Sequence, residues 1–478
     1  LTPGLTDAHL HLLEWACARR RVDLADAASP TDAAARVARR AADSVAGDWV
    51  VGGGWNPHRW AARPTRGPLD RAVPDRPVAL RSHDMHAWWV NGEALARAGI
   101  GPDSPDPPGG RIVRDPVTGE PTGELLEEAG RLVAERIPKP EDARLEAAVL
   151  EAQAELHRQG VTGVHSIEMP GDSFDSLRVL TALHGEGRLR LRVLQHLPLG
   201  TLESAVRLGL RSGMGDARLR IGAVKIFLDG ALGSRTAWLR EPYEGEGAGG
   251  DRGVRLLDDD AFDHAVRRAA AVGIASAVHA IGDAAVALAI DTLGAAPRVG
   301  ALPHRIEHVQ LCPVERVGEI AAAGLACSMQ PAHLMTDWRA AERHWGRARC
   351  RGAYAFRTLR RAAPDAILAF GSDSPVEPVD PRLGLYAATA RRDLDGEPDG
   401  GWYPDERLSP AEALEAYTVG PARAGGAAGR RGRLAAGFDA DIAAWSRDPL
   451  SRRRRDDWLE LGCMATMVAG EWVWRDRE

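Results

Sequence analysis

Two histidines near the start of the chain, His9 and His11, are separated by a single residue in the segment DAHLH. The flanking residues fit a β-strand, in which residues i and i+2 point to the same face. Both imidazoles can therefore enter one cavity, and neutral imidazole nitrogens suit a divalent transition metal. This spacing alone fits a metal site and a chance pair of strand histidines equally well. Further ligands are needed to distinguish the two.

Three more polar residues lie at the ends of apolar, strand-like segments. His279 lies in SAVHAIGD, His308 in HRIEHVQ and Asp373 in AFGSDSP. Each alone has a structural explanation: a hydrogen-bonded core histidine or, for Asp373, a turn or helix N-cap. Together with the first pair they make four histidines and one aspartate at the ends of four strands. This combination favours one shared site.

Lysine is scarce in this chain, which makes its positions informative. Of the 61 lysines and arginines, only Lys139 and Lys225 are lysine. Lys139 lies in the polar segment IPKPED, which predicts a linker. Lys225 lies in the apolar run IGAVKIFLDG, where an amine can do chemistry that a guanidinium cannot. The alternative is a strand-end lysine whose side chain reaches to water.

The strands and helices that would position these residues alternate regularly along the chain. Between residues 141 and 420, short apolar runs alternate with segments of helical period. Strand–helix alternation predicts a parallel sheet. With the opening segment GLTDAHLHL the count reaches about eight strands, the number that a (β/α)8 barrel requires. The carboxyl ends of barrel strands carry the active site, and most of the polar residues above lie at such ends.

The alternation also indicates the domain organisation. We expect the barrel to start in residues 1–47 and to resume over residues 141–430. Residues 48–140 break the rhythm and predict an inserted, lid-like subdomain, whose tryptophans are equally explained as its own core. Residues 431–478 hold short alternating segments with glycine turns. They predict strands of a small β-sandwich that lacks its amino-terminal strands.

Composition excludes several classes of protein. The chain has 478 residues, of which 44% are hydrophobic and 27% charged, and its formal net charge is −6. Disorder, a transmembrane helix and a basic nucleic-acid or membrane surface are therefore not expected. The five cysteines are scattered, which fits a reducing compartment and predicts a cytoplasmic protein. The expected partner is a small-molecule substrate, and a homodimer stays open.

The chain resembles the amidohydrolase superfamily, specifically amidohydrolase family 3, the branch with N-substituted formamide deformylase-like enzymes. The segments that carry the resemblance are PGLTDAHLHL, VKIFLDGALGSRTA, VHAIGDAAV, HRIEHVQ and GSDSPVEPVDPR. It extends through nearly the whole chain and implies a (β/α)8 barrel, one or two divalent metals and hydrolysis of amide-type carbon–nitrogen bonds by water. The chain departs from the family at its amino terminus, where the strands that complete the β-sandwich are absent.

The resemblance implies roles for the five strand-end residues. His9 and His11 would bind the buried metal, and His279 and His308 the more exposed one. Asp373 would be both a metal ligand and the general base. Such mixed imidazole and carboxylate ligands suit zinc, and manganese, iron or cobalt stay open.

For Lys225 the resemblance implies an N-carboxylated side chain between the two metals, with a part in catalysis. An unmodified ammonium would be repelled by two neighbouring divalent cations. Carboxylation reverses its charge and supplies two oxygens that can bridge the metals. Arginine cannot form this group usefully because it stays protonated. The persistence of lysine at this position is consistent with that role.

Further residues are candidates for substrate binding. His86 matches the pocket histidine of the family, where it would contact the substrate and polarise its carbonyl, although Met85 replaces the usual preceding glycine. Arg305 and Glu307 are candidates for hydrogen-bonding to the ligands. The remaining candidates, each equally explained as a structural residue, are Trp88, Asp229, Arg235 and Gln330.

We therefore predict a metal-dependent hydrolase that cleaves an N-substituted formamide, an N-acyl amine or a cyclic amide by a metal-activated hydroxide. Because a fold does not fix a reaction, the same hydroxide would serve a lactonase, a phosphotriesterase or a deaminase. A non-catalytic scaffold is disfavoured because all six metal-site positions carry competent side chains.

Overall fold

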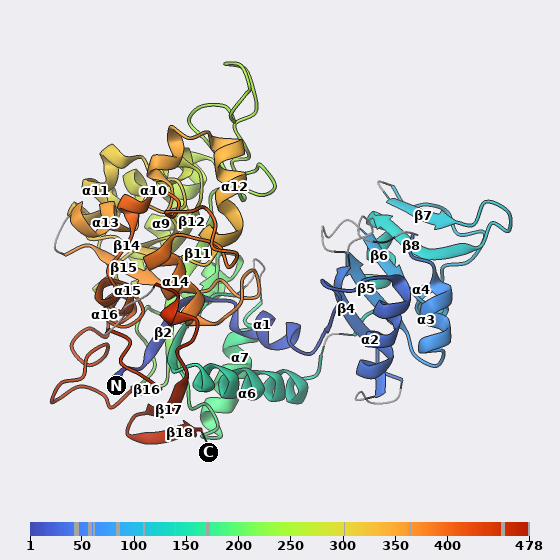
Figure 1. Cartoon of the computed structure of the whole chain (residues 1–478), viewed down its shortest axis with the longest axis horizontal. Coiled ribbons are helices and arrows are strands. Elements are labelled where there is room, and N and C mark those ends of the chain that lie inside the picture. Colours follow the sequence, from blue (N-terminus) through green and yellow to red (C-terminus); the bar gives the residue numbers. More distant parts are fainter. Residues whose placement is uncertain are drawn as a thin grey trace. The chain divides into compact units, whose positions relative to one another are not determined.

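The computed structural model describes residues 1–42, 47–55, 60, 63–82, 87–108, 110–138, 140–168, 173–300, 302–362, 365–450 and 455–476. The chain folds into two compact units (Figure 1). One unit contains Leu1–Ala16 and Leu145–Glu478, and the other contains Cys17–Arg144. The subdomain predicted over residues 48–140 lies within the second unit.

The first unit is built on eight parallel strands. In spatial order they are β2 (Leu5–Leu10), β9 (Val161–Ser166), β10 (Arg192–Pro198), β11 (Leu219–Phe227), β12 (Ser276–Ala280), β13 (Arg305–His308), β14 (Ala326–Met329) and β15 (Ile367–Phe370). The segment after β15 returns to β2, where the N–H of Asp373 donates to the carbonyl of His9 at 2.7 Å. The N–H of His11 donates to the carbonyl of Ser374 at 3.1 Å. The sheet is therefore a nearly closed (β/α)8 barrel, as predicted.

Amphipathic helices pack on the outside of this barrel. In α9, Phe262 and Val266 are buried, and the Asp258 side chain caps the first turn by accepting from the Ala261 N–H at 2.7 Å. No helix of the described residues has the length and hydropathy needed to cross a membrane. The helices that lie wholly or mostly in this unit are α1 (Leu12–Ala18), α6 (Asp142–Arg158), α7 (Asp175–Gly185), α8 (Leu202–Arg207), α9 (Asp259–Ala271), α10 (Asp283–Ala295), α11 (Val317–Ala322), α12 (His333–Trp345), α13 (Phe356–Ala362), α14 (Pro381–Ala390), α15 (Pro410–Ala416) and α16 (Val419–Ala424).

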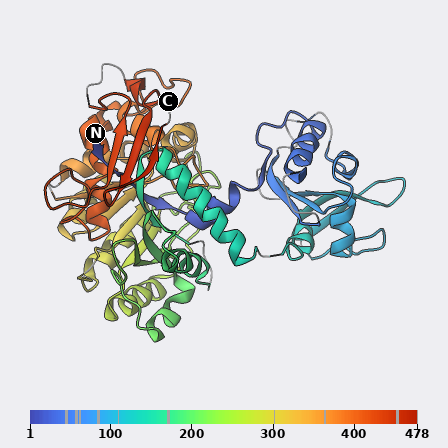
Figure 2. The same ribbon diagram turned by 90° about the horizontal axis from the view of Figure 1, so that it is seen from below.

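A four-stranded antiparallel sheet joins the two ends of the chain. Its order is β1 (Thr2–Pro3), β16 (Ile442–Trp445), β17 (Cys463–Val468) and β18 (Glu471–Arg475). Figure 2 shows these strands beside the amino terminus. The first strand comes from residues 2 and 3, so the carboxyl-terminal strands find one of their partners inside this chain. Thr466 ties the sheet to α6 because its hydroxyl donates to the His157 carbonyl at 2.6 Å.

The second unit contains a six-stranded mixed sheet. Its order is β3 (Val22–Asp23), β4 (Val50–Trp55), β5 (Val78–Ser82), β6 (Ala87–Val90), β8 (Pro121–Glu127) and β7 (Gly110–Arg114). The helices α2 (Pro30–Ala42), α3 (Arg66–Ala72), α4 (Gly92–Ala98) and α5 (Arg131–Ala134) belong to the same unit.

Tryptophans build the interior of the second unit. Trp55 and Trp60 stack with ring centroids 5.6 Å apart, and Trp89 meets Trp60 edge-on at 5.5 Å. These three indoles are buried, so they are core residues of this unit. Trp88, a candidate for substrate binding, lies against Gly130 of the same unit, where an added Cβ would come 2.1 Å from its ring. A lid function for this unit stays a prediction.

Candidate metal centre

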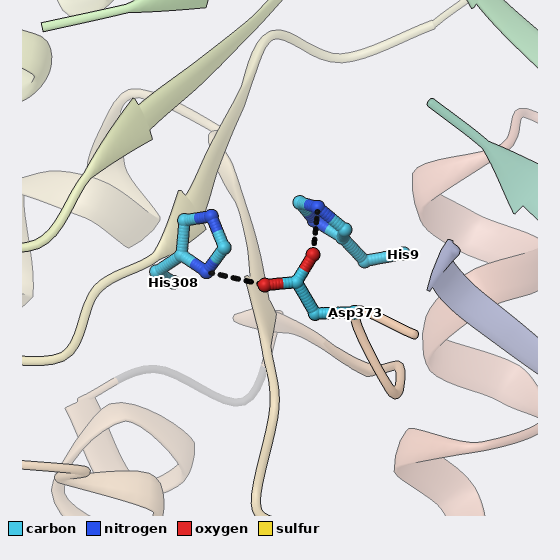
Figure 3. Close-up of side chains that lie close together, drawn as sticks. All are labelled: His9, His308 and Asp373. Carbon is cyan, nitrogen blue, oxygen red and sulfur yellow. Dashed lines mark ion pairs between the residues drawn. The ribbon is translucent and has the colours of Figure 1, made fainter. Parts of the chain in front are cut away.

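Three buried side chains meet at the carboxyl ends of the barrel strands: His9, His308 and Asp373 (Figure 3). One potential ligand atom from each lies within 4.8 Å of the others. His9 comes from β2, His308 is the last residue of β13, and Asp373 follows β15. The structure therefore brings together residues from three strands that the sequence predicts as ligands.

Asp373 is the point on which the first histidine pair converges. Its Oδ1 lies 3.1 Å from His9 Nε2 and 3.1 Å from His11 Nε2. Yet His9 Nε2 and Asp373 Oδ1 form no hydrogen bond with any described residue. The atoms are close but do not face one another along a hydrogen bond, as expected of side chains directed at a common point. These orphaned buried atoms fit a bound cation.

The surroundings of Asp373 favour the ionised form of its carboxylate. Burial opposes its charge, but the neighbouring His9 imidazole holds the pKa of Asp373 well below the usual value. An ionised carboxylate between imidazoles is a chemically suitable ligand for a divalent transition metal.

His9 is held in place by a buried ion pair. Its Nδ1 lies 2.7 Å from Glu307 Oε2, and the same oxygen accepts from Arg305 Nη2 at 2.9 Å. Although burial opposes its charge, Arg305 and His9 hold the pKa of Glu307 well below the usual value. Because Nδ1 contacts Glu307, Nε2 is the ring nitrogen of His9 that remains for a metal. Arg305 and Glu307 thus occupy the supporting positions proposed for them.

His279 lies beside this cluster at the end of β12. Its ring centroid is 4.5 Å from that of His308. Its Nε2 lies 3.0 Å from the carbonyl of Gly230 and 3.5 Å from Asp229 Oδ1. The structure therefore places all four predicted histidine ligands in one neighbourhood.

Asp229 organises the loop around His279. Its carboxylate accepts backbone N–H groups of Trp238, Ile281 and Gly282 at 2.9, 3.0 and 2.8 Å. Burial raises the pKa of Asp229 to about 7, against the effect of these bonds. The side chain therefore positions the strand end, which is the structural alternative considered for it.

Lys225 lies in the barrel interior on β11. Its side chain is 2% exposed, and Nζ forms no hydrogen bond with any described residue. Nζ lies 4.8 Å from the ring centroid of Phe227. Burial lowers the pKa of Lys225 to about 8, and Glu307 and Asp373 oppose this shift. A buried amine without a hydrogen-bond partner is unfavourable, so this position requires an explanation beyond packing.

The other residues predicted to bind substrate differ in whether they contact the metal cluster. Gln330 contacts the cluster, because its Oε1 accepts from His308 Nδ1 at 2.8 Å. Arg235 instead pairs with Glu246 and lies 4.9 Å from the ring centroid of Tyr243. Among the described residues it contacts no member of the cluster. His86 lies outside the described residues.

One residue near the metal centre, His333, was missed by the sequence analysis. Its Nε2 lies 3.5 Å from Asp373 Oδ2, and its Nδ1 lies 3.1 Å from Gln310 Nε2. It is the first residue of α12, so no strand end marks it. The sequence feature that could have indicated His333 is its position three residues after Gln330 in SMQPAH.

A cavity of about 220 Å³ adjoins Lys225. Most of its walls are apolar, with Glu168 and Lys225 as the charged groups among the lining residues. The apolar lining residues include Pro198, Leu199 and Phe227. This arrangement suits a small ligand with an apolar part directed away from the metal centre.

Comparison with known proteins identifies the family. The model of an amidohydrolase family matches residues 1–474. The chain belongs to this family. It is 33% identical to the putative amidohydrolase YtcJ of Bacillus subtilis over 455 residues, which cover 94% of this chain and 84% of that protein. It is 28% identical to the N-substituted formamide deformylase of Arthrobacter pascens, over 98% of this chain and 87% of that protein.

A solved structure shares the fold. It is an uncharacterized metal-dependent hydrolase from Pyrococcus horikoshii, 29% identical, with a TM-score of 0.77 over 94% of this chain and 86% of that chain. Family membership confirms the resemblance found in the sequence and the prediction of an enzyme, a metal-dependent amidohydrolase.

Proposed function

We propose that the protein hydrolyses the carbon–nitrogen bond of an N-substituted formamide, an N-acyl amine or a cyclic amide. The observation that carries the proposal is the convergence of His9 and His11 on Asp373, with orphaned buried atoms directed at one point. The name of the relative from Arthrobacter pascens supports an N-substituted formamide as the first substrate class to test.

His9, His11 and Asp373 would hold one divalent metal, and Lys225, His279 and His308 would complete a site for a second. Imidazole and carboxylate ligands favour zinc. When bound, such a metal polarises a carbonyl and lowers the pKa of water from 15.7 to about 7. No side-chain base alone provides this activation.

Asp373 is the proposed general base and acid. As an ionised carboxylate at the centre of the cluster it can accept a proton from water. The same group then donates that proton to the leaving nitrogen, which departs as a neutral amine. The backbone N–H of Asp373, which donates to the His9 carbonyl at 2.7 Å, would hold the residue in place during both transfers.

Lys225 is proposed to carry a carboxyl group on Nζ. The neutral amine would add to carbon dioxide, form an N–C bond and release one proton. Support comes from the burial of Nζ and its lack of a hydrogen-bond partner among the described residues. Intact-protein mass spectrometry under native conditions should show an increment of one carbon dioxide. Lys225→Met should abolish this increment, and the exposed variant Arg267→Gln should keep it.

The cavity beside Lys225 would receive the substituent on nitrogen. Leu199, Phe227 and Pro198 offer apolar surface to an alkyl or aryl group. A substrate with a charged substituent would have to bury that charge against this wall, which is unfavourable.

The test is a substrate panel on the zinc-loaded enzyme. It contains N-formyl and N-acetyl amines with alkyl and aryl substituents, cyclic amides, a lactone, a phosphotriester and an aminated purine. Amine release from the first group, lost in Asp373→Asn and kept in Arg267→Gln, supports the proposal. Turnover of only the lactone, the phosphotriester or the aminated base would reject it in favour of another hydrolase on the same fold.

A further inference from the structure

A second cavity, of about 40 Å³, lies at the opposite end of the barrel from the metal centre. Its lining includes Thr6 and Arg220, the second residues of β2 and β11. The proposed metal ligands lie at the other ends of the strands, so this cavity is not part of that site. A single water needs about 10–15 Å³ by this measure, so the space suits a small ion.

Arginine dominates the lining of this cavity. Four arginines and one acidic residue contribute to it: Arg192, Arg218, Arg220, Arg431 and Asp441. Arg192 makes a two-pronged ion pair with Asp441, at 2.6 and 2.9 Å. Arg431 Nε donates to Asp439 at 3.0 Å. Because Asp439 also pairs with Arg430, these carboxylates are fewer than the guanidinium groups around them.

Among the described residues, the guanidinium groups of Arg218 and Arg220 form hydrogen bonds only with backbone carbonyls. Arg220 donates to the carbonyl of Gly425, and Arg218 donates to the carbonyl of Arg190 at 2.6 Å. A carbonyl satisfies one N–H group but does not neutralise the charge, and each guanidinium has five such groups. Arg218 and Arg220 are both only partly exposed, so water screens their charges incompletely.

Like charges add to this imbalance. Burial lowers the pKa of Arg220, and the neighbouring Arg431 lowers it further. Burial also lowers the pKa of Arg218; Arg192 adds to that shift, and Asp441 and Glu471 oppose it. Positive groups therefore lie near one another around a partly open cavity, an arrangement that a bound anion would stabilise.

We propose that this cavity binds a small tetrahedral oxyanion, such as phosphate or sulfate, through Arg218 and Arg220. Planar guanidinium groups donate paired N–H groups that match the oxygens of such anions. The excess of positive charge in the lining favours a multiply charged anion over a singly charged one. The proposal does not depend on the substrate of the metal centre.

Isothermal titration calorimetry and thermal unfolding of the full chain test the proposal. Inorganic phosphate and sulfate are compared with chloride at equal ionic strength. We expect phosphate or sulfate to raise the Tm and chloride to leave it unchanged. Arg220→Gln should weaken binding of the oxyanion by about tenfold or more. Arg207→Gln, which removes the same charge from an exposed site on α8, should change Kd less than about twofold.

Crystals soaked in tungstate locate the anion independently of any variant. An anomalous peak between Arg218 and Arg220 supports the proposal, and tungstate found only elsewhere overturns it. Binding that persists in Arg220→Gln at wild-type strength also overturns it, because the anion then lies at the metal centre or on the surface. If Arg220→Gln does not fold, Arg218→Gln replaces it, with the same expected loss of affinity.

Discussion

Glu307 Oε2 accepts from both His9 and Arg305, at 2.7 Å from His9 Nδ1 and 2.9 Å from Arg305 Nη2. One carboxylate thus fixes the orientation of a proposed metal ligand and neutralises a buried guanidinium. Glu307→Gln should therefore lower metal affinity by about 10- to 100-fold. Competition with a chromogenic chelator measures this loss. Glu319→Gln, which alters an exposed ion pair with Arg316, is the matched control. Unchanged metal affinity in Glu307→Gln would show that His9 does not depend on this bond.

Asp373→Asn removes the proposed proton acceptor while preserving the size of the side chain. We expect kcat to fall by about 10²-fold or more, because general acid–base catalysis typically contributes this much. Steady-state kinetics on the best substrate of the panel gives the value, and circular dichroism verifies the fold. A kcat within about threefold of wild type would exclude Asp373 as the general base.

The apolar cavity predicts a specific change in substrate preference. Leu199→Trp should fill part of the space beside Lys225 and lower kcat/KM for an N-aryl formamide by about tenfold. The value for N-methylformamide should change far less, because its substituent needs little room. Equal losses for both substrates would indicate a general disturbance of the site.

The buried side chain of His157 should make the stability of the protein depend on pH. Burial, followed by the charges of Arg190 and Arg218, lowers its pKa from 6.5 to about 4. The unfolded chain binds this proton more tightly than the folded protein does. The free energy of unfolding is therefore highest above pH 6.5 and decreases as the pH falls toward 4. Between pH 7.5 and pH 5, protonation of this residue lowers the free energy of unfolding by about 2 kcal/mol. Urea unfolding of His157→Gln should show a smaller loss over this range than the wild type. His264→Gln, on an exposed part of α9, should lose as much as the wild type.

The side chain of Asn91 should contribute strongly to the stability of the second unit. Its buried amide makes four hydrogen bonds, from the N–H groups of Val78 and Ala94 and to the carbonyls of Val73 and Arg76. Asn91→Ala leaves these groups unsatisfied and should destabilise this unit by about 2–5 kcal/mol. Hydrogen exchange of the backbone amides of β5 and β6 measures the stability of this unit separately from the barrel. Glu93→Ala, an exposed change on α4, should cost less than about 0.5 kcal/mol.

The sequence predicted those features that depend on strand periodicity. The barrel followed from alternating strands and helices, and His9 and His308 followed from their positions in or at the end of such strands. His333 escaped because it reaches Asp373 from the start of a helix. The strand at residues 2 and 3 is too short to carry a pattern. The distant partner of Arg235, Glu246, lies in a loop whose path no local rule determines.

Barrels of this class usually fill their interior with branched apolar side chains. Here a buried polar chain occupies part of that space: His165 Nδ1 lies 2.9 Å from Arg305 Nη1, and Arg305 contacts Glu307, the partner of His9. Replacing such an ion pair by well-packed apolar residues often stabilises a protein. In this enzyme the same replacement would release His9, so engineering for thermal resistance has to begin outside the barrel lumen.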